Sequence, residues 1–550
     1  MVNKEIARQF SLLASLMELH GENAFKTKTY ANAYLALRKW DQPIAEMTEA
    51  EIEAIPGIGS SVSSKIHELN TTGHMDMLEK WKAKTPEGIQ QLLSLKGLGP
   101  KKVRQIWDEL QVESPTELLY ACNENRLVKL SGFGLKTQED LKQKLTYFLE
   151  TRHQLLYGSC EEELHQFLRD IKKEFPGHRM EWAGEFATNS PVINQLVLLV
   201  APALTADQLS PHSALRLMEE MPDGAWLVEY SERFKIRFQF TAPDRFSLEW
   251  SRLTMHPALF EKIIATKSLK GDESPAVILS EGGYAGLPIE WLDREGAAFA
   301  QPVNWSEIIT NANIKGILHN HSTWSDGIHS LEEMSIAVRD GGYQYFAICD
   351  HSRTAFYANG LSVERVLEQM AEIDRINQKL APFKVFKGIE SDILGDGSLD
   401  YEPDILSKFD LVVASVHSNL NMTEEKAMVR LIRAIENPYT RILGHPTGRL
   451  LLARQGYPID HRKIIDACAA NGVAIELNAN PLRLDIDYAW LEYCMEKEVW
   501  VSINPDAHSR GQIEYVKYGV LAARKGGLNR NSCLNALPLE EFENWVSQKA

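Results

Sequence analysis

The C-terminal part of the chain holds nine potential metal ligands, most of them at the ends of short apolar runs. Six are histidines and three are carboxylates, and no thiolate is among them. Imidazole and carboxylate together suit Zn²⁺ or Mn²⁺, with Fe²⁺ as a further option. Because one tetrahedral ion needs only four ligands, this number predicts a centre of two or three divalent ions. The nine residues are His319, His321, Asp326, His351, Glu390, His417, His445, Asp506 and His508.

The apolar runs predict a closed parallel sheet. Seven of them alternate with stretches of helical period, such as residues 330–341 and 362–380. Alternating strands and helices favour a β/α barrel, whose chemistry lies at the carboxyl ends of the strands. The predicted strands are Ile317–His319, Tyr345–Cys349, Lys384–Ile389, Leu411–Val416, Arg441–Gly444, Val473–Leu477 and Trp500–Ile503.

Six of the seven predicted strands deliver ligands to one rim. Side chains alternate between the two faces of a strand, so His319 and His321 are expected to point the same way from one strand end. Glu476 and Asn478 leave the seventh strand, and we expect them to support the ligands. His329 lies in a polar loop and is expected to have no role in metal binding.

Glu390 and Asp506 are the expected catalytic carboxylates. With His319 and His321 they would hold one ion, and Glu390 would bridge to a second. Divalent ions in such a centre activate water for attack on phosphorus and stabilise the departing oxygen.

Two arginines that follow ligand motifs are candidate catalytic residues. Arg353 and Arg449 could bind phosphate oxygens in bidentate fashion, with ordinary salt bridging as the alternative. Lys387 and Arg483 are further candidates for contacts to a substrate strand.

Composition limits the classes of function. A net charge of −16 over 550 residues disfavours wrapping of nucleic acid by bulk charge. The length predicts several domains. No apolar run approaches the ~18 residues of a membrane span, so we expect a cytoplasmic protein without a membrane partner. The six cysteines form no CxxC pair and are expected to be reduced and buried.

The first 150 residues contain a repeated glycine motif. Three Gly-apolar-Gly triplets recur at offsets of 40 and 35 residues, each before a predicted helix. Paired glycines let the backbone turn tightly and bring its amides close to an anion, and the helix N-terminus adds partial positive charge. This helix–hairpin–helix pattern is typical of proteins that contact DNA phosphates without reading sequence. The glycines are Gly57, Gly59, Gly97, Gly99, Gly132 and Gly134.

Basic residues gather at the second triplet. Lys101 and Lys102 follow it directly, although residues 1–150 hold 19 basic and 20 acidic side chains in all. We therefore expect weak, salt-sensitive and non-specific DNA binding.

Taken together, the motifs HxH with its following Asp, DHS, GIES, SVHS, GHPTGR and DAH resemble the PHP (polymerase and histidinol phosphatase) domain of bacterial family X DNA polymerases. The resemblance covers essentially the whole chain and retains all nine ligand positions. It implies a Mn²⁺- or Zn²⁺-dependent 3′→5′ exonuclease and phosphoesterase that works in DNA repair. Its expected partner is gapped, nicked or 3′-ended DNA, and the expected state is a monomer.

The resemblance also implies the domain organisation. An all-α helix–hairpin–helix region would precede an α+β nucleotidyltransferase-like palm and thumb and a distorted (β/α)7 PHP barrel. The expected parts are a lyase-like helical domain at 1–85, a fingers-like domain at 86–150, a degenerate palm and thumb at 151–300, a linker at 301–313 and the PHP domain at 314–550.

The middle segment departs from the family pattern. Active relatives carry G-S-x-R-R and then D-x-D on the first palm strand, whereas Gln195 and Val197 stand at the two Asp positions here. Ala187 and Thr188 replace the arginines, and Arg237 stands at the third carboxylate. Two-metal nucleotidyl transfer needs carboxylate oxygens, so the sequence predicts that polymerase activity is lost.

A lyase site is a further implication of the resemblance. Lys65 matches the Schiff-base lysine of lyase-active relatives, and Tyr30 matches a tyrosine that lines that site. Ser61 replaces a nearby lysine, and contact between Lys65 and a phosphate or solvent is the favoured alternative.

Three other functions stay open. A small-molecule phosphatase of histidinol-phosphate type would explain the barrel but not the three hairpins. A DNA-binding scaffold with a purely structural metal would not need an open rim. An active family X repair polymerase with a PHP nuclease is the remaining alternative.

Overall fold

The computed structural model describes residues 3–40, 42–123, 127–151, 154–209, 214–231, 234–266, 273–296, 305–452 and 455–548. Residues 301–304 of the predicted linker lie outside these ranges. The chain divides into two compact units, Met1–Arg152 and His153–Ala550. Each unit has its own hydrophobic core, so each is described by itself.

The first unit contains helices and no strand within its described residues. Local sequence signals set the helix ends: Thr48 and Glu51 form a capping box at α3, and Pro100 occupies the first turn of α7. The helices are α1 (Asn3–Leu19), α2 (Ala24–Leu37), α3 (Glu49–Glu53), α4 (Ser60–Thr72), α5 (Asp76–Lys82), α6 (Glu87–Ser94), α7 (Pro100–Leu110), α8 (Pro115–Asn123) and α9 (Leu135–Thr151), with 3-10 turns η1 (Ile44–Glu46) and η2 (Leu127–Lys129).

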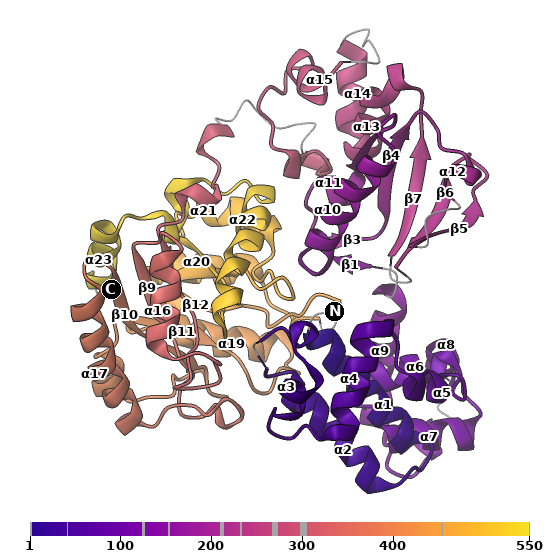
Figure 1. The fold of residues 1–550 in the computed structure, drawn as a ribbon. Helices are drawn as coiled ribbons and strands as arrows, with labels where there is room; N and C mark the ends of the chain where they lie inside the picture. Colours follow the sequence, from indigo (N-terminus) through magenta and orange to yellow (C-terminus); the bar gives the residue numbers. More distant parts are fainter. Residues whose placement is uncertain are drawn as a thin grey trace. The chain divides into compact units, whose positions relative to one another are not determined.

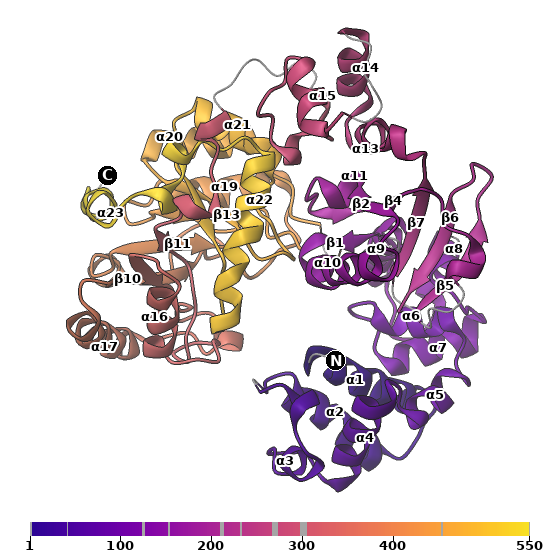
Figure 2. The ribbon, with the colours of Figure 1, turned by 45° about the horizontal axis from the view of Figure 1, so that its top comes forward.

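The second unit opens with a five-stranded mixed sheet, ordered β2-β4-β7-β6-β5 (Figure 2). Successive side chains of β4 enter different cores, with Leu196 and Leu198 on one face and Val197 and Leu199 on the other. The strands are β2 (Arg179–Ala183), β4 (Leu196–Ala201), β5 (Leu215–Glu220), β6 (Trp226–Tyr230) and β7 (Phe234–Phe240).

Helices precede, separate and follow these strands in the sequence. Strands β1 (Leu155–Leu156) and β3 (Val192–Ile193) form a separate two-stranded sheet. The Trp291 and Trp305 rings pack against each other, with their centroids 5.1 Å apart. The helices are α10 (Tyr157–Glu174), α11 (Gly184–Ala187), α12 (Ala206–Leu209), α13 (Phe246–Thr254), α14 (Pro257–Thr266) and α15 (Pro275–Glu281).

A seven-stranded parallel sheet follows, in the order β8 to β14. Strands β9 to β12 of this sheet are labelled in Figure 1. An isolated parallel bridge between Asn320 and Ala507 joins the sheet's two edges, so the sheet is a nearly closed barrel, as predicted. The strands are β8 (Gly316–Ile317), β9 (Tyr345–Ile348), β10 (Lys384–Asp392), β11 (Leu411–Ser415), β12 (Ile442–Leu443), β13 (Ala474–Asn478) and β14 (Val501–Asn504).

Helices lie between the barrel strands, and side-chain caps begin most of the longer ones. Ser330 forms a capping box with Glu333, while Ser362, Thr423 and Asp460 cap later helices. The helices are α16 (Leu331–Asp340), α17 (Val363–Leu380), α18 (Pro403–Leu406), α19 (Glu424–Ile435), α20 (His461–Asn471), α21 (Leu491–Glu496), α22 (Val516–Lys525) and α23 (Leu539–Ser547).

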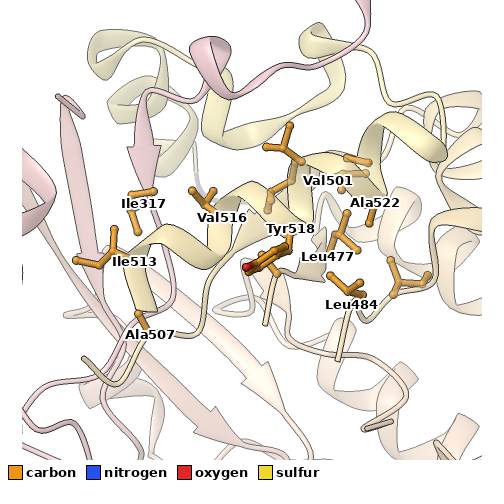
Figure 3. Close-up of a cluster of buried hydrophobic side chains, with 14 of the residues drawn as sticks. Ile317, Leu477, Leu484, Val501, Ala507, Ile513, Val516, Tyr518 and Ala522 are labelled. Carbon is orange, nitrogen blue, oxygen red and sulfur yellow. The ribbon is translucent and has the colours of Figure 1, made fainter. Parts of the chain in front are cut away.

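Helix α22 packs against the last strands of the barrel, β13 and β14 (Figure 3). Val516 and Ala522 belong to the buried apolar cluster that also contains Leu477 of β13 and Val501 of β14. This packing fixes the segment that follows the ligand motif at residues 506–508.

The prediction that His319 and His321 alternate along a strand is wrong. Strand β8 ends at Ile317, and His319 adopts φ 56, so the two histidines do not alternate along a strand. A left-handed backbone at His319, rather than strand pleating, brings both rings to the same site. The other six predicted strands agree with the observed ones within a few residues.

None of the helices within the described ranges is both long enough and apolar enough to span a membrane. The six cysteines are buried and form no disulfide within the described ranges, as predicted for reduced side chains.

Candidate metal centre

All seven barrel strands place polar side chains at one rim. Six strands are followed by, or end in, one of the predicted ligands, and the ligands are buried or partly buried. Three overlapping groups have ligand atoms within 4.8 Å of one another, and His321 and His351 each belong to two of them. The groups are His321, Asp326, His351 and His508; His319, His321 and Asp506; and His351, Glu390 and His417.

Glu390 lies at the centre of this arrangement. Its carboxylate oxygens lie 3.0–3.7 Å from imidazole nitrogens of five histidines. His445, the ninth predicted ligand, joins the site through this carboxylate, with Nε2 3.0 Å from Oε1. The structure therefore brings all nine predicted ligands together. The five histidines are His319, His321, His351, His417 and His445.

The pKa of the Glu390 carboxyl reflects these neighbours. Burial alone would raise it, but His417, His319 and His351 hold it well below its ordinary value. Burial would also raise the pKa of the Asp326 carboxyl, but hydrogen bonds from His351 and His508 lower this pKa below its ordinary value. Both carboxylates are therefore charged at neutral pH, as a cation site requires.

The histidines fall into two electrostatic classes. Burial lowers the pKa of His319, but three surrounding carboxylates raise it well above its ordinary value. The pKa of His321 is lowered by burial and by the nearby His508 and His351 rings. His321 is thus neutral and ready to donate a lone pair, whereas His319 holds a proton that a metal ion would displace.

Residues behind the ligands fix their orientation. Glu476 Oε1 lies 2.6 Å from His319 Nδ1, and its Oε2 accepts a hydrogen bond from the His445 backbone amide at 2.7 Å. Asn478 donates to Asp506 Oδ2 at 3.1 Å. The prediction that Glu476 and Asn478 support the ligands is confirmed by these contacts.

Asp392 has a similar role that the sequence argument missed. Its Oδ1 lies 2.5 Å from His417 Nδ1, and its Oδ2 accepts a hydrogen bond from Thr354 Oγ1 at 2.9 Å. The signal was present in the sequence, because Asp392 stands two residues after Glu390 and so on the same face of β10.

Three predicted ligands have a positive φ: His445, with φ 20, and two that lie well inside the left-handed region that L-residues rarely adopt. His319 has φ 56 and Asp506 has φ 51. Such strain costs about 1–3 kcal/mol per residue and persists where the surrounding structure holds the residue in place. At both positions the strained backbone turns a side chain toward the ligand cluster.

The donor set fits divalent metal ions. Nδ1 of His321 and Nδ1 of His445 are buried and have no hydrogen-bond partner within the described residues. Buried imidazole nitrogens normally find a partner, so orphaned ones beside carboxylates are suited to a cation. The overlapping groups fit a multinuclear centre.

The two predicted phosphate-binding arginines are bonded to their own chain. Arg353 donates to the Asp400 carbonyl at 2.6 Å, and half of its side chain is exposed. Arg449 donates to Asp487 at 2.6 Å and to two backbone carbonyls. Arg483 lies closer to a ligand, with Nε 3.7 Å from Asp506 Oδ2, and Lys387 pairs with Asp374.

The glycine triplets of the first unit form turns before helices. Gly57, Gly97 and Gly132 have φ between 82 and 100, a region that favours glycine. The apolar residue at the centre of each triplet is buried and anchors the turn. Helices α4 and α7 begin without a side-chain cap and without acidic residues in the first turn, so their amides can bind an anion.

Lysines lie beside two of these turns. Lys101 and Lys102 are exposed, and Lys102 Nζ lies 5.5 Å from the Phe133 ring of the third triplet. In the first triplet region, Lys65 Nζ lies 5.8 Å from the Tyr30 ring and donates to the Ser61 carbonyl.

The three positions aligned with the family's palm carboxylates lie on, or directly next to, two neighbouring strands of one sheet. Gln195 immediately precedes β4, and Val197 of β4 is the register partner of Arg237 of β7. Val197 is 7% exposed, and Arg237 forms an ion pair with Asp223. Glu185, the nearest preceding carboxylate in the sequence, accepts hydrogen bonds from the backbone amides of Asn194 and Gln195.

Comparisons with known proteins find relatives of the N-terminal helical region and of the whole chain. Residues 1–75 match the family "Helix-hairpin-helix domain", and residues 89–146 match "SAM-like Helix-hairpin-helix tandem". Over 577 aligned residues, the chain is 33% identical to the DNA polymerase/3′-5′ exonuclease PolX of Bacillus subtilis, covering 100% of each protein.

Smaller relatives match only part of the chain. A probable phosphatase of Caldanaerobacter subterraneus is 29% identical over 25% of this chain and 58% of its own length. One from Thermoanaerobacter sp. is 26% identical over 35% of this chain and 85% of its own length.

Proposed function

Because the chain belongs to the PolX family of family X DNA polymerase/3′-5′ exonucleases, we propose that it processes DNA ends in repair, with the barrel as its hydrolytic centre. The observation that carries this proposal is the convergence of nine imidazole and carboxylate ligands on one rim. Its substrates are gapped, nicked or 3′-ended DNA, bound without sequence preference. The enzyme acts as a monomer in the cytoplasm.

The proposed ligands are the nine rim residues, and two or three Mn²⁺ or Zn²⁺ ions, or Fe²⁺, are their proposed occupants. When bound, such ions supply a deprotonated water near neutral pH and stabilise the departing 3′ oxygen. Glu390 and Asp506 keep the site anionic, while Glu476 and Asp392 hold His319 and His417 in fixed orientations. This fixed geometry lets the site bind cations without rearrangement.

The domain division proposed is the one expected from the sequence: 1–85, 86–150, 151–300, 301–313 and 314–550. DNA contacts are assigned to the three glycine triplets together with Lys101 and Lys102. Uncapped helix N-termini and exposed lysines support this assignment. A lyase role for Lys65 and Tyr30 stays a lesser proposal.

We also propose that the palm does not polymerise. Supporting this are the side chains at its three aligned positions: Gln195 is an amide, Val197 is apolar and Arg237 is a cation engaged by Asp223. None can hold Mg²⁺. Thr188, in the place of a family arginine, donates to Asp293 at 2.8 Å.

The full-length similarity favours the second candidate, an active repair polymerase with a PHP nuclease. The Bacillus subtilis relative carries both activities in its name and aligns over its entire length. A small-molecule phosphatase is favoured by the partial relatives, which match a quarter to a third of the chain. It leaves the hairpin region without a role.

One experiment separates these functions. Purified protein with Mn²⁺ is given a 3′-recessed and a gapped DNA, with and without nucleotides, alongside His319→Ala/His321→Ala. A matched control is His461→Ala, since His461 stacks on Trp490 outside the ligand groups. Stepwise loss from the 3′ end that only the double variant abolishes, without extension, is the expected result.

Other outcomes would assign the protein differently. Nucleotide incorporation that survives the double variant would establish the polymerase. Cleavage of phosphomonoesters without any action on DNA would establish the small-molecule phosphatase.

A further inference from the structure

The loop after β13, residues 480–487, folds back onto the end of its own strand. Its Asp485 carbonyl accepts a hydrogen bond from the Asn478 amide at 2.6 Å, and the Ile486 amide donates to the Glu476 carbonyl at 2.9 Å. Leu484, with φ 44, makes the tight turn between these contacts and Arg483. The loop is therefore fastened to the same strand end that supports His319 and Asp506.

Arg483 is the cation that this loop holds at the ligand cluster. Its Nε lies 3.7 Å from Asp506 Oδ2, beyond hydrogen-bond distance, and only 19% of its side chain is exposed. Asp506 has closer partners, since Asn478 donates to Oδ2 at 3.1 Å and His321 Nε2 lies 3.1 Å from Oδ1.

Most of the N–H donors of the Arg483 guanidinium have no acceptor within the described residues. A guanidinium carries five N–H donors, and within the described residues the Arg483 side chain makes no hydrogen bond and no ion pair other than this approach to Asp506. Its nitrogens are not among the buried polar atoms that lack a partner, so these donors are accessible to a phosphate that enters the site.

Arg449 builds the loop rather than the anion site. Its Nε donates to the Arg483 carbonyl at 3.0 Å, Nη1 donates to Asp487 at 2.6 Å and Nη2 donates to the Leu484 carbonyl. All three nitrogens are therefore engaged within residues 483–487. The Leu451 amide adds a hydrogen bond to the Leu482 carbonyl at 2.7 Å.

Other cations near the rim fit a phosphate less well. Arg353 is 52% exposed and donates to the Asp400 carbonyl. Lys387 pairs with Asp374 at 2.6 Å.

From these contacts we propose that Arg483 binds the non-bridging oxygens of the substrate phosphate, and that Arg449 is the positioning residue that holds it there. The proposal rests on the hydrolytic function of the barrel and names the group that recognises its substrate class, phosphate esters. A guanidinium presents two parallel donors to two phosphate oxygens, and its charge opposes the negative charge that develops during attack. Asp506 keeps the guanidinium aligned from the side of the ligands.

The test uses full-length protein loaded with Mn²⁺ and four variants: Arg483→Ala, Arg483→Lys, Arg449→Ala and the control Arg339→Ala. Arg339 is an exposed arginine of α16 that pairs with its neighbour Asp340. Bound Mn²⁺ is measured by elemental analysis, and folding is checked by thermal unfolding. Turnover is measured with bis(p-nitrophenyl) phosphate, and binding of inorganic phosphate is followed by ³¹P relaxation.

Arg483→Ala is expected to keep its Mn²⁺ and to lose about 10²–10³-fold in kcat, the usual effect of removing one preorganised donor. Phosphate binding should weaken by at least about tenfold. Millimolar guanidinium should restore part of the rate of Arg483→Ala, whereas Arg483→Lys should stay impaired because it lacks the planar pair of donors.

Arg449→Ala should lose less rate, weaken phosphate binding and gain nothing from guanidinium, since its defect is a loosened loop. Wild-type phosphate binding and rate in Arg483→Ala would overturn the proposal, and so would losses that match a loss of Mn²⁺. If the wild-type protein hydrolyses no ester, the hydrolytic function fails. The phosphate-binding comparison would still decide the role of Arg483.

Discussion

The barrel rim and the palm sheet both bring polar positions together on neighbouring strands, but they use them differently. At the rim, Glu390 lies within 3.7 Å of five imidazoles, and Nδ1 of His321 and Nδ1 of His445 are buried without a hydrogen-bond partner among the described residues. In the palm, Val197 and Arg237 are register partners, and Arg237 pairs with Asp223 of the same domain. This contrast supports the proposal that the palm does not polymerise, because a few side chains, rather than the arrangement of strands, decide which chemistry a fold performs.

The loop that precedes β4 makes the contrast sharper. Thr188 and Ser190 both donate to Asp293, which pairs with the buried Lys525 of α22 at 2.6 Å. These polar groups satisfy one another within the chain. The rim groups, in contrast, include buried ring nitrogens and an arginine side chain that have no hydrogen-bond partner among the described residues.

The largest effect is expected at Glu390. Glu390→Gln removes the charge that balances five histidines, so metal binding should fall and DNA cleavage should drop by about 10³-fold or more. Elemental analysis and single-turnover rates measure both, with the exposed Glu436→Gln as control. Full metal content and full activity in Glu390→Gln would contradict the central role of this carboxylate.

The next effect should appear in stability alone. Lys525→Met leaves Asp293 without its buried partner, and breaking such a pair costs about 3–5 kcal/mol. Denaturant unfolding measures this loss, while turnover of a small diester at a permissive temperature should be unchanged. Lys517→Met, on the same helix, removes a more exposed pair with Glu161 and should cost about 1 kcal/mol or less. Equal losses in the two variants would contradict the contrast.

A pH effect should distinguish the rim from any ordinary buried ion pair. The pKa of His319 and of His351 is raised well above the ordinary value of 6.5 by surrounding carboxylates, against the effect of burial. A metal ion binds neutral imidazole, so binding must release these protons. At pH values below the folded pKa values of these histidines, Mn²⁺ affinity should therefore rise by about tenfold per pH unit for each proton released.

The same pKa shifts also make the folding stability of the metal-free protein depend on pH. The raised histidine pKa values contribute stability that is present below pH 6.5 and is lost as pH rises through the folded values. The depressed pKa of Glu390 contributes stability above its ordinary value that is lost on acidification. Mn²⁺ affinity that does not change between pH 7 and 8, followed by electron paramagnetic resonance, would count against proton displacement.

The smallest effect is expected in the hairpins. Lys101→Ala/Lys102→Ala should weaken DNA binding several-fold, equally for all sequences, and lower the salt slope by about 2, as for two phosphate contacts. Fluorescence anisotropy at several salt concentrations measures this, with Lys80→Ala in α5 as control. A change in sequence preference, or an unchanged salt slope, would exclude these lysines as phosphate contacts.

Much of the fold could be predicted from the sequence, because the sequence patterns that indicate its strands and turns are local. Alternating apolar runs and helical stretches predicted seven parallel strands, and strand-end placement identified nine ligands that the fold brings together. The three glycine triplets predicted turns before helices, and positive φ at Gly57, Gly97 and Gly132 confirms them. Residue type and spacing suffice wherever backbone conformation and polarity depend on near neighbours.

Tertiary structure alone decided the contacts between segments far apart in the chain. Within the described residues, Arg483 rather than Arg449 is the arginine that approaches a predicted ligand, because a loop after β13 doubles back and uses Arg449 to fasten itself. His319 faces the site through a left-handed backbone instead of a strand. Sequence determined which chemistries are available. Long-range packing determined which side chains keep donors free for a ligand, because hydrogen bonds within the chain compete for the same atoms.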